Sequence, residues 1–124
     1  MAVSVLLIDD SEAFLPGIAN YLMLLGCRVS VALTMRAGLG VASQAPPNVI
    51  VMDVHMRDMD GPEAIHRLRA DAYLSNVPVI AMATQERDHD RQRCLDAGAS
   101  AYVSKLIERE SLAAIILAYA RRCP

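Results

Sequence analysis

Five polar residues interrupt an otherwise apolar pattern, and each stands where a short apolar run ends. Two adjacent carboxylates, Asp9 and Asp10, close the first run, and Asp53 closes a later one. Thr84 and Lys105 follow two further runs. Three carboxylates held close together repel one another and attract a hard cation such as Mg²⁺, which prefers oxygen ligands. A nearby lysine offsets the remaining charge and can hold an anion, and a threonine hydroxyl can donate a hydrogen bond to an incoming oxygen.

The elements that must position these residues are short apolar strands alternating with amphipathic helices. The expected strands cover residues 3–8, 28–32, 48–52, 77–83 and 101–103. The expected helices cover residues 12–25, 87–97 and 108–122, with two more beginning after Thr34 and at Pro62. Strands that are almost entirely Val, Ile and Leu are typical of a parallel sheet covered on both faces. The pattern predicts one doubly wound α/β domain over residues 1–124, with the polar residues gathered at one sheet edge.

Single residues predict where several helices begin and end. Pro16 and Pro62 suit the first turn of a helix, where a missing N–H costs little. Thr34 suits an N-cap. Gly26 and Gly98 suit the turns that terminate helices.

Two helices differ in the width of their apolar faces. In the helix that begins at Pro62, three basic side chains are expected to point to solvent: His66, Arg67 and Arg69. The last helix has an apolar stripe made of Leu112, Ile115, Ile116 and Tyr119, and a second apolar flank made of Ala113, Leu117 and Ala120. A helix that is apolar nearly all round usually buries its other side too. The second flank is therefore expected to form a dimer or partner contact; the alternative is a wide core face with small alanines exposed.

Composition excludes several classes of protein. With 54% hydrophobic and 21% charged residues, the chain is not disordered. A formal net charge of −2 without a basic stripe argues against direct binding of nucleic acid. The longest apolar run, residues 112–120, is too short to cross a bilayer, and the apolar N-terminus lacks the basic flank of a signal peptide. Three widely separated cysteines indicate a reducing compartment, so a cytoplasmic location is expected.

Four segments match one known family in order and in spacing. They are residues 6–11, 49–61, 77–84 and 96–105. Together they span nearly the whole chain and resemble the response regulator receiver domain, the CheY-like family of two-component signalling. The resemblance implies a flavodoxin-like (βα)5 domain with strand order 2-1-3-4-5.

The resemblance also implies a role for each polar residue of the sheet edge. Asp53 would be the phosphoacceptor, whose carboxylate attacks phosphorus to form an acyl phosphate. Asp9, Asp10 and Asp53 would hold Mg²⁺ or Mn²⁺ together with the backbone carbonyl of His55. Lys105 would pair with an oxygen of the phosphoryl group.

Two further residues would report the modification. Thr84 would swing inward to the phosphoryl group, and Tyr102 would change rotamer as Thr84 moves. This movement would reshape the surface formed by residues 87–97, 101–103 and 108–122, where a homodimer or a target would bind. The implied phosphoryl donor is a sensor histidine kinase or a phosphotransfer protein.

The chain departs from the family pattern at three positions. Leu106 replaces the proline that usually follows the lysine, so a trans peptide and a shifted loop are expected around Lys105. Arg57 also replaces a proline and is expected to loosen the loop after Asp53. Gln85 replaces a small residue and is expected to crowd the phosphoryl site, giving atypical phosphorylation kinetics.

The leading hypothesis is a phosphoacceptor module that catalyses only its own phosphorylation and dephosphorylation and is not a conventional enzyme. The alternative is a degenerate receiver that acts as a phosphorylation-independent interaction scaffold. A metal-dependent phosphohydrolase with Asp53 as nucleophile ranks last, because His55 stands where that class needs a second acid. The sequence leaves open whether the domain acts alone or belongs to a longer regulator or hybrid kinase.

Overall fold

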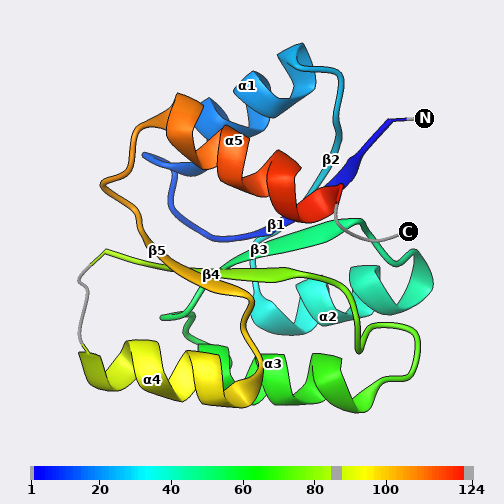
Figure 1. Ribbon diagram of the computed structural model, residues 1–124, viewed down its shortest axis with the longest axis vertical. Helices are drawn as coiled ribbons and strands as arrows, with labels where there is room; N and C mark the ends of the chain where they lie inside the picture. The colour runs from blue at the N-terminus through cyan, green and yellow to red at the C-terminus, as the bar shows by residue number, and fades with distance from the viewer. Residues whose placement is uncertain (1, 85–87, 122–124) are drawn as a thin grey trace.

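The chain folds into three layers, with a parallel sheet between two layers of helices (Figure 1). The computed structural model describes residues 2–84 and 88–121. Within these residues, five strands pair in the order β2-β1-β3-β4-β5. They are β1 (Ser4–Ile8), β2 (Arg28–Ala32), β3 (Val49–Asp53), β4 (Val79–Ala83) and β5 (Ala101–Ser104). The predicted doubly wound fold and its strand order are confirmed.

Helices cover both faces of the sheet. In the described part of the chain they are α1 (Leu15–Leu24), α2 (Met35–Gln44), α3 (Gly61–Ala70), α4 (Asp88–Ala97) and α5 (Arg109–Ala120). Helices α1 and α5 lie on one face, and α2, α3 and α4 lie on the other (Figure 1). Each helix is a crossover between two parallel strands or follows the last one, so all five strands point the same way.

The core has two halves because side chains alternate along each strand. In β1, Val5 and Leu7 pack on the side of α1 and α5, whereas Leu6 and Ile8 pack on the side of α2, α3 and α4. All four are at most 1% exposed. The edge strand β2 is more exposed than the other strands.

Most of the predicted helix signals are confirmed. The Thr34 hydroxyl accepts a hydrogen bond from the backbone N–H of Ala37, and Gly26 and Gly98 adopt positive φ angles of 91° and 117°. Glycine takes these angles without the strain that a Cβ would cause. The first helix begins at residue 15 rather than 12, because residues 12–14 form a turn before it. Residues 87 and 122, the expected start and end of two helices, lie outside the described residues.

Arg69 does not point into solvent, which corrects the prediction for α3. Its guanidinium is partly buried and donates to the backbone carbonyl of Gly98 from Nε at 3.0 Å and from Nη2 at 2.8 Å. Its Nη1 donates to three more carbonyls, those of Val77 at 2.7 Å and of Leu74 and Ser75 at 3.2 Å. Burial lowers the pKa of Arg69 below the ordinary value for arginine. The side chain therefore joins α3, the loop before β4 and the turn before β5.

The second apolar flank of α5 is also placed differently from the prediction. Ala113 and Ala120 are 2% and 6% exposed and pack in the core beside Leu112 and Ile116. Leu117 is partly buried against the same cluster. Ala114 and Ala118 occupy the exposed side of the helix. The flank thus belongs to a wide core face with small alanines outside, and the expectation that it forms a partner contact is wrong.

Candidate functional site

The ends of β1 and β3 bring three carboxylates together. These strands are adjacent and parallel, with Ile8 opposite Met52, so the residues that follow them emerge at the same edge. One carboxylate oxygen from each of Asp9, Asp10 and Asp53 lies within 4.8 Å of the other two. Three convergent oxygens of this kind suit a hard divalent cation such as Mg²⁺. The predicted convergence of the carboxylates is confirmed.

Lys105 reaches this cluster from the end of β5. Its Nζ lies 2.7 Å from Oδ2 of Asp9 and 2.9 Å from Oδ2 of Asp53, and its side chain is 9% exposed. Burial by itself would lower the pKa of Lys105, but the hydrogen bonds and charges of Asp9 and Asp53 outweigh it. The pKa of Lys105 is therefore raised above the ordinary value for lysine. The ammonium stays charged throughout the neutral pH range.

The replacement of proline by Leu106 leaves Lys105 in place. Every peptide bond in the described residues is trans, as expected for this one. The Lys105 N–H donates to the carbonyl of Ala83 at 2.9 Å, which continues the pairing of β5 with β4. The Leu106 side chain points outward and is 83% exposed. The trans peptide before Leu106 thus leaves the Lys105 ammonium in contact with Asp9 and Asp53.

The remaining predicted residues surround the cluster at different depths. Thr84 directly follows β4 at the same sheet edge and is exposed, whereas Tyr102 in β5 is 7% exposed. The backbone N–H of His55 donates to Oδ1 of Asp53 at 2.9 Å, which orients the carboxylate. The His55 imidazole lies outside, with Nε2 at 3.6 Å from Oδ2 of Asp90 in α4. Gln85 lies outside the described residues.

Two contacts at the site were missed by the sequence analysis. The ring of Phe14 lies under the lysine, with Nζ of Lys105 at 5.0 Å from the ring centroid, a distance suited to a cation–π contact. The backbone N–H of Ser11 donates to Oδ1 of Asp9 at 2.7 Å. Phe14 is the only phenylalanine of the chain, but its neighbours in sequence do not indicate that it meets a residue 91 positions later. That proximity comes from the packing of α1 beside the start of α5, where a hollow of about 370 Å³ lies.

The loop between β3 and α3 is anchored, although Arg57 is exposed. The Val54 N–H donates to the carbonyl of Met82 at 3.0 Å, and the Gly61 N–H donates to the carbonyl of Val54 at 2.9 Å. The side chains of Met56 and Met59 are 7% and 5% exposed. These contacts hold both ends of the loop. The hydrogen bonds of the loop therefore do not show the loosening that was expected from Arg57.

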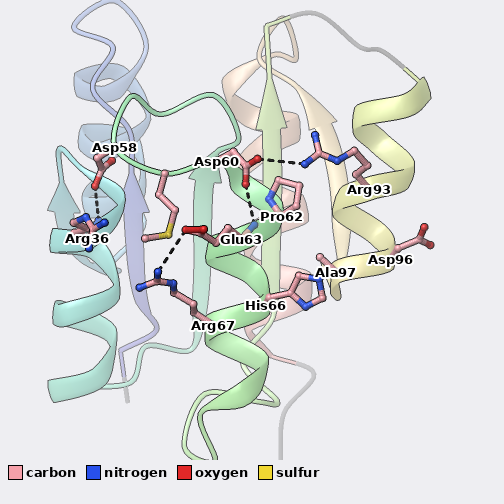
Figure 2. A pocket seen from close by; sticks show the side chains of 11 residues that line it. Arg36, Asp58, Asp60, Pro62, Glu63, His66, Arg67, Arg93, Asp96 and Ala97 are labelled. Atoms are coloured by element: carbon pink, nitrogen blue, oxygen red, sulfur yellow. Dashed lines mark hydrogen bonds and ion pairs between the residues drawn. The ribbon is translucent and has the colours of Figure 1, made fainter.

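A larger hollow, of about 940 Å³, lies on the face formed by α2, α3 and α4 (Figure 2). Its charged side chains pair with one another: Glu63 with Arg67 at 3.5 Å and Asp60 with Arg93 at 3.2 Å. The hollow interleaves four acids with three arginines, whereas the sheet edge concentrates three carboxylates and one ammonium. The chemistry of the chain is better placed at the sheet edge.

Comparison with known proteins agrees with this arrangement. A sequence model of the response regulator receiver domain matches residues 5–117. The chain belongs to the response regulator receiver domain family. As a receiver domain it is a component of two-component systems.

Individual relatives of this receiver domain support the assignment. The transcriptional regulatory protein KdpE of Mycobacterium tuberculosis is 33% identical over 118 residues, which cover 95% of the chain and 51% of KdpE. The chain thus spans about half the length of this curated relative. In the described part of the chain, no helix is both long and apolar enough to cross a membrane.

Solved structures resemble the receiver domain over almost its full length. The receiver domain of the sensor histidine kinase PA1611 from Pseudomonas aeruginosa is 28% identical, with a TM-score of 0.88 over 97% of this chain and 98% of that one. That structure holds a magnesium ion in its active site cleft. The chemotaxis response regulator CheY4 of Vibrio cholerae is 25% identical, with a TM-score of 0.89 over 96% of this chain and 99% of that one.

Proposed function

We propose that this receiver domain accepts a phosphoryl group on Asp53 and transmits the change to its surface. The observation that carries the proposal is the position of the Lys105 ammonium, within 2.9 Å of both Asp9 and Asp53. The site thus combines oxygen ligands for a cation with a fixed positive charge for an anion. Both are needed to bind a phosphoryl group, whose own charge is negative.

The proposed step uses the carboxylate of Asp53 as the nucleophile. A carboxylate oxygen forms a bond to phosphorus while the bond between phosphorus and the donor's leaving group breaks, and the leaving group keeps the electron pair. The His55 N–H holds Oδ1 of Asp53 and so limits rotation of the carboxylate before attack. Lys105 neutralises the phosphoryl oxygens after the transfer. The domain catalyses only its own phosphorylation and the hydrolysis of the resulting acyl phosphate, and it is not a conventional enzyme.

The residues proposed to hold Mg²⁺ or Mn²⁺ are Asp9, Asp10, Asp53 and, through its backbone carbonyl, His55. When bound, the cation neutralises charge on the transferring group and favours in-line attack. Asp9 and Asp53 are each held at both oxygens, since one oxygen accepts from a backbone N–H, that of Ser11 or of His55, and the other pairs with Lys105. The magnesium ion in the related PA1611 receiver domain supports this proposal.

We also infer that Thr84 and Tyr102 form the switch. The exposed hydroxyl of Thr84 at the end of β4 is free to rotate toward Asp53, and the movement would reach Tyr102 in the neighbouring strand. The proposed readout is the surface formed by α4, β5 and α5, where a target or a second copy would bind. The proposed donor is a sensor histidine kinase or a phosphotransfer protein, and the match to the histidine kinase BarA of Escherichia coli, 31% identical over 119 residues, supports this class.

The test is the intact mass of the protein after incubation with acetyl phosphate and Mg²⁺. The parent is expected to gain the mass of one phosphoryl group and Asp53→Asn none. Asp71→Asn is the matched control, because Asp71 is a partly exposed acid at the C-terminal end of α3. An adduct on all three proteins would place the modification elsewhere. The absence of an adduct on the parent, together with measurable Mg²⁺ binding, would favour the interaction scaffold instead.

A further inference from the structure

The carboxylate of Asp58 ties the loop after β3 to the beginning of helix α2. Its Oδ1 accepts a hydrogen bond from the backbone N–H of Met35 and its Oδ2 one from that of Arg36, each at 2.9 Å. Met35 and Arg36 are the first two residues of α2. Figure 2 shows Asp58 leaning from the loop onto the end of this helix. Both oxygens are thus committed to a helix that precedes Asp58 by more than twenty residues.

These contacts are favourable because the first N–H groups of a helix have no partner within the helix, and a negative charge there also meets the positive end of the helix dipole. The hydrogen bonds from Arg36 and Met35 hold the pKa of Asp58 below its ordinary value. The local N-cap, Thr34, accepts from a different group, the N–H of Ala37 at 3.1 Å. Helix α2 therefore has two separate caps, and only that of Asp58 connects it to the loop.

The same loop leads from Asp58 back to the phosphoacceptor. At its start, the backbone N–H of Val54 donates to the carbonyl of Met82 in β4, and the backbone N–H of His55 donates to the Asp53 carboxylate. Beyond Asp58, the carboxylate of Asp60 caps α3 through the N–H of Glu63 at 3.0 Å. An antiparallel bridge between His55 and Asp60 closes this loop, and Asp58 holds its tip against α2, so the backbone of residues 55–57 is placed by the bridge and the Asp58 contacts together.

We propose that Asp58 is a positioning residue for the phosphoryl-acceptor site, fixing the loop against α2 so that the His55 backbone stays in register with Asp53. Its effect is to preorganise the His55 carbonyl for a divalent cation and the His55 N–H for the Asp53 carboxylate. This inference rests on the proposed function, because it assigns the His55 backbone to that site. It adds a residue from outside the carboxylate cluster that determines how well the cluster binds a cation.

The test compares Mg²⁺ affinity, measured by calorimetric titration, in the parent and three variants. Asp58→Ala removes both hydrogen bonds and is expected to weaken Mg²⁺ binding by about tenfold, the lower end of the losses seen when outer supports of metal ligands are removed. Asp58→Asn keeps one oxygen acceptor but turns an NH2 group toward the other backbone N–H, so it is expected to bind Mg²⁺ with an affinity between those of Asp58→Ala and the parent. Thr34→Ala removes a cap from the same helix but leaves the loop tied, and is expected to bind Mg²⁺ like the parent.

Each other result would overturn the proposal. If Asp58→Asn is as weak as Asp58→Ala, the charge of Asp58 acts at a distance and its hydrogen bonds do not matter. If Thr34→Ala loses the same affinity, the effect comes from the stability of α2. If Asp58→Ala binds Mg²⁺ like the parent, Asp58 is only a helix cap. A parent that neither binds Mg²⁺ nor gains a phosphoryl group would refute the proposed function as well, whereas a normal parent with a normal Asp58→Ala refutes this inference alone.

Discussion

Nζ of Lys105 lies 2.7 Å from Oδ2 of Asp9, a residue that is 3% exposed. The same ammonium lies 2.9 Å from Asp53, so one positive charge is shared by two carboxylates in a largely buried site. Lys105 is the only lysine of the chain, and the other basic side chains are arginines and histidines. A divalent cation held by the same carboxylates, as proposed, would partly take the place of the ammonium.

The first prediction follows from this overlap between the roles of the ammonium and of a divalent cation. Lys105→Met leaves Asp9 buried without its partner, so the free energy of unfolding in the absence of Mg²⁺ should fall by about 3–5 kcal/mol. Millimolar Mg²⁺ should restore part of the loss, because it binds the folded state and compensates the same charge. Urea unfolding with and without Mg²⁺ measures both effects. A loss that Mg²⁺ does not reduce would show that the lysine matters for packing rather than for charge.

The second prediction concerns the buried guanidinium of Arg69. Arg69→Met removes hydrogen bonds to four backbone carbonyls, and we expect the free energy of unfolding to fall by about 2–4 kcal/mol. Arg67→Met is the matched control, since Arg67 lies on the same helix and only pairs with Glu63 at 3.5 Å on the surface. That variant should change stability by no more than about 0.5 kcal/mol. Equal losses in chemical denaturation would contradict the role assigned to Arg69.

The third prediction uses two glycines of α2. A Cβ at Gly38 would lie 2.6 Å from Cγ1 of Ile8, a fully buried residue beside Asp9. Gly38→Ala should therefore destabilise the fold by about 1–3 kcal/mol through overpacking, despite the better helix propensity of alanine. Gly40 has open space around it, so Gly40→Ala should stabilise the fold by about 0.5–1 kcal/mol. Opposite signs in urea unfolding are the expected result; two stabilising substitutions would refute the packing argument.

The fourth prediction is a dependence of stability on alkaline pH. Burial, and then the charge of Asp90, raises the pKa of the Cys94 thiol from 9.0 to about 11. The pKa of the thiol is higher in the folded state than in the unfolded state. The contribution of the protonated thiol to the free energy of unfolding is therefore complete below pH 9 and is lost as the pH rises toward 11. Between pH 8 and pH 10.5 the parent should lose about 2 kcal/mol more than Cys94→Ala. The comparison removes the effect of other groups that titrate there, and parallel losses in the two proteins would contradict the raised pKa.

Much of the fold and of the candidate site could be predicted because the signals are local. The alternation of apolar strands with amphipathic helices gives the layers, and polar residues mark the ends of β1, β3, β4 and β5. Since all strands of a parallel sheet end at the same edge, Asp9, Asp53 and Lys105 had to come together once the sheet was predicted. Thr34 and Gly26 acted as caps for reasons contained within a few residues.

The tertiary structure decided what depends on partners distant in the chain. Arg69 has the same helical spacing as an exposed residue, and only the turns before β4 and β5 offer the carbonyls that bury it. Phe14 meets Lys105, and Asp58 meets the start of α2, because loops from separate crossovers lie side by side. Ala113 and Ala120 of the second flank of α5 lie in the core beside Leu112 and Ile116, whereas Ala114 and Ala118 face outward. Sequence periodicity determines which residues share a face, but the direction of that face is determined by the surfaces available to cover it.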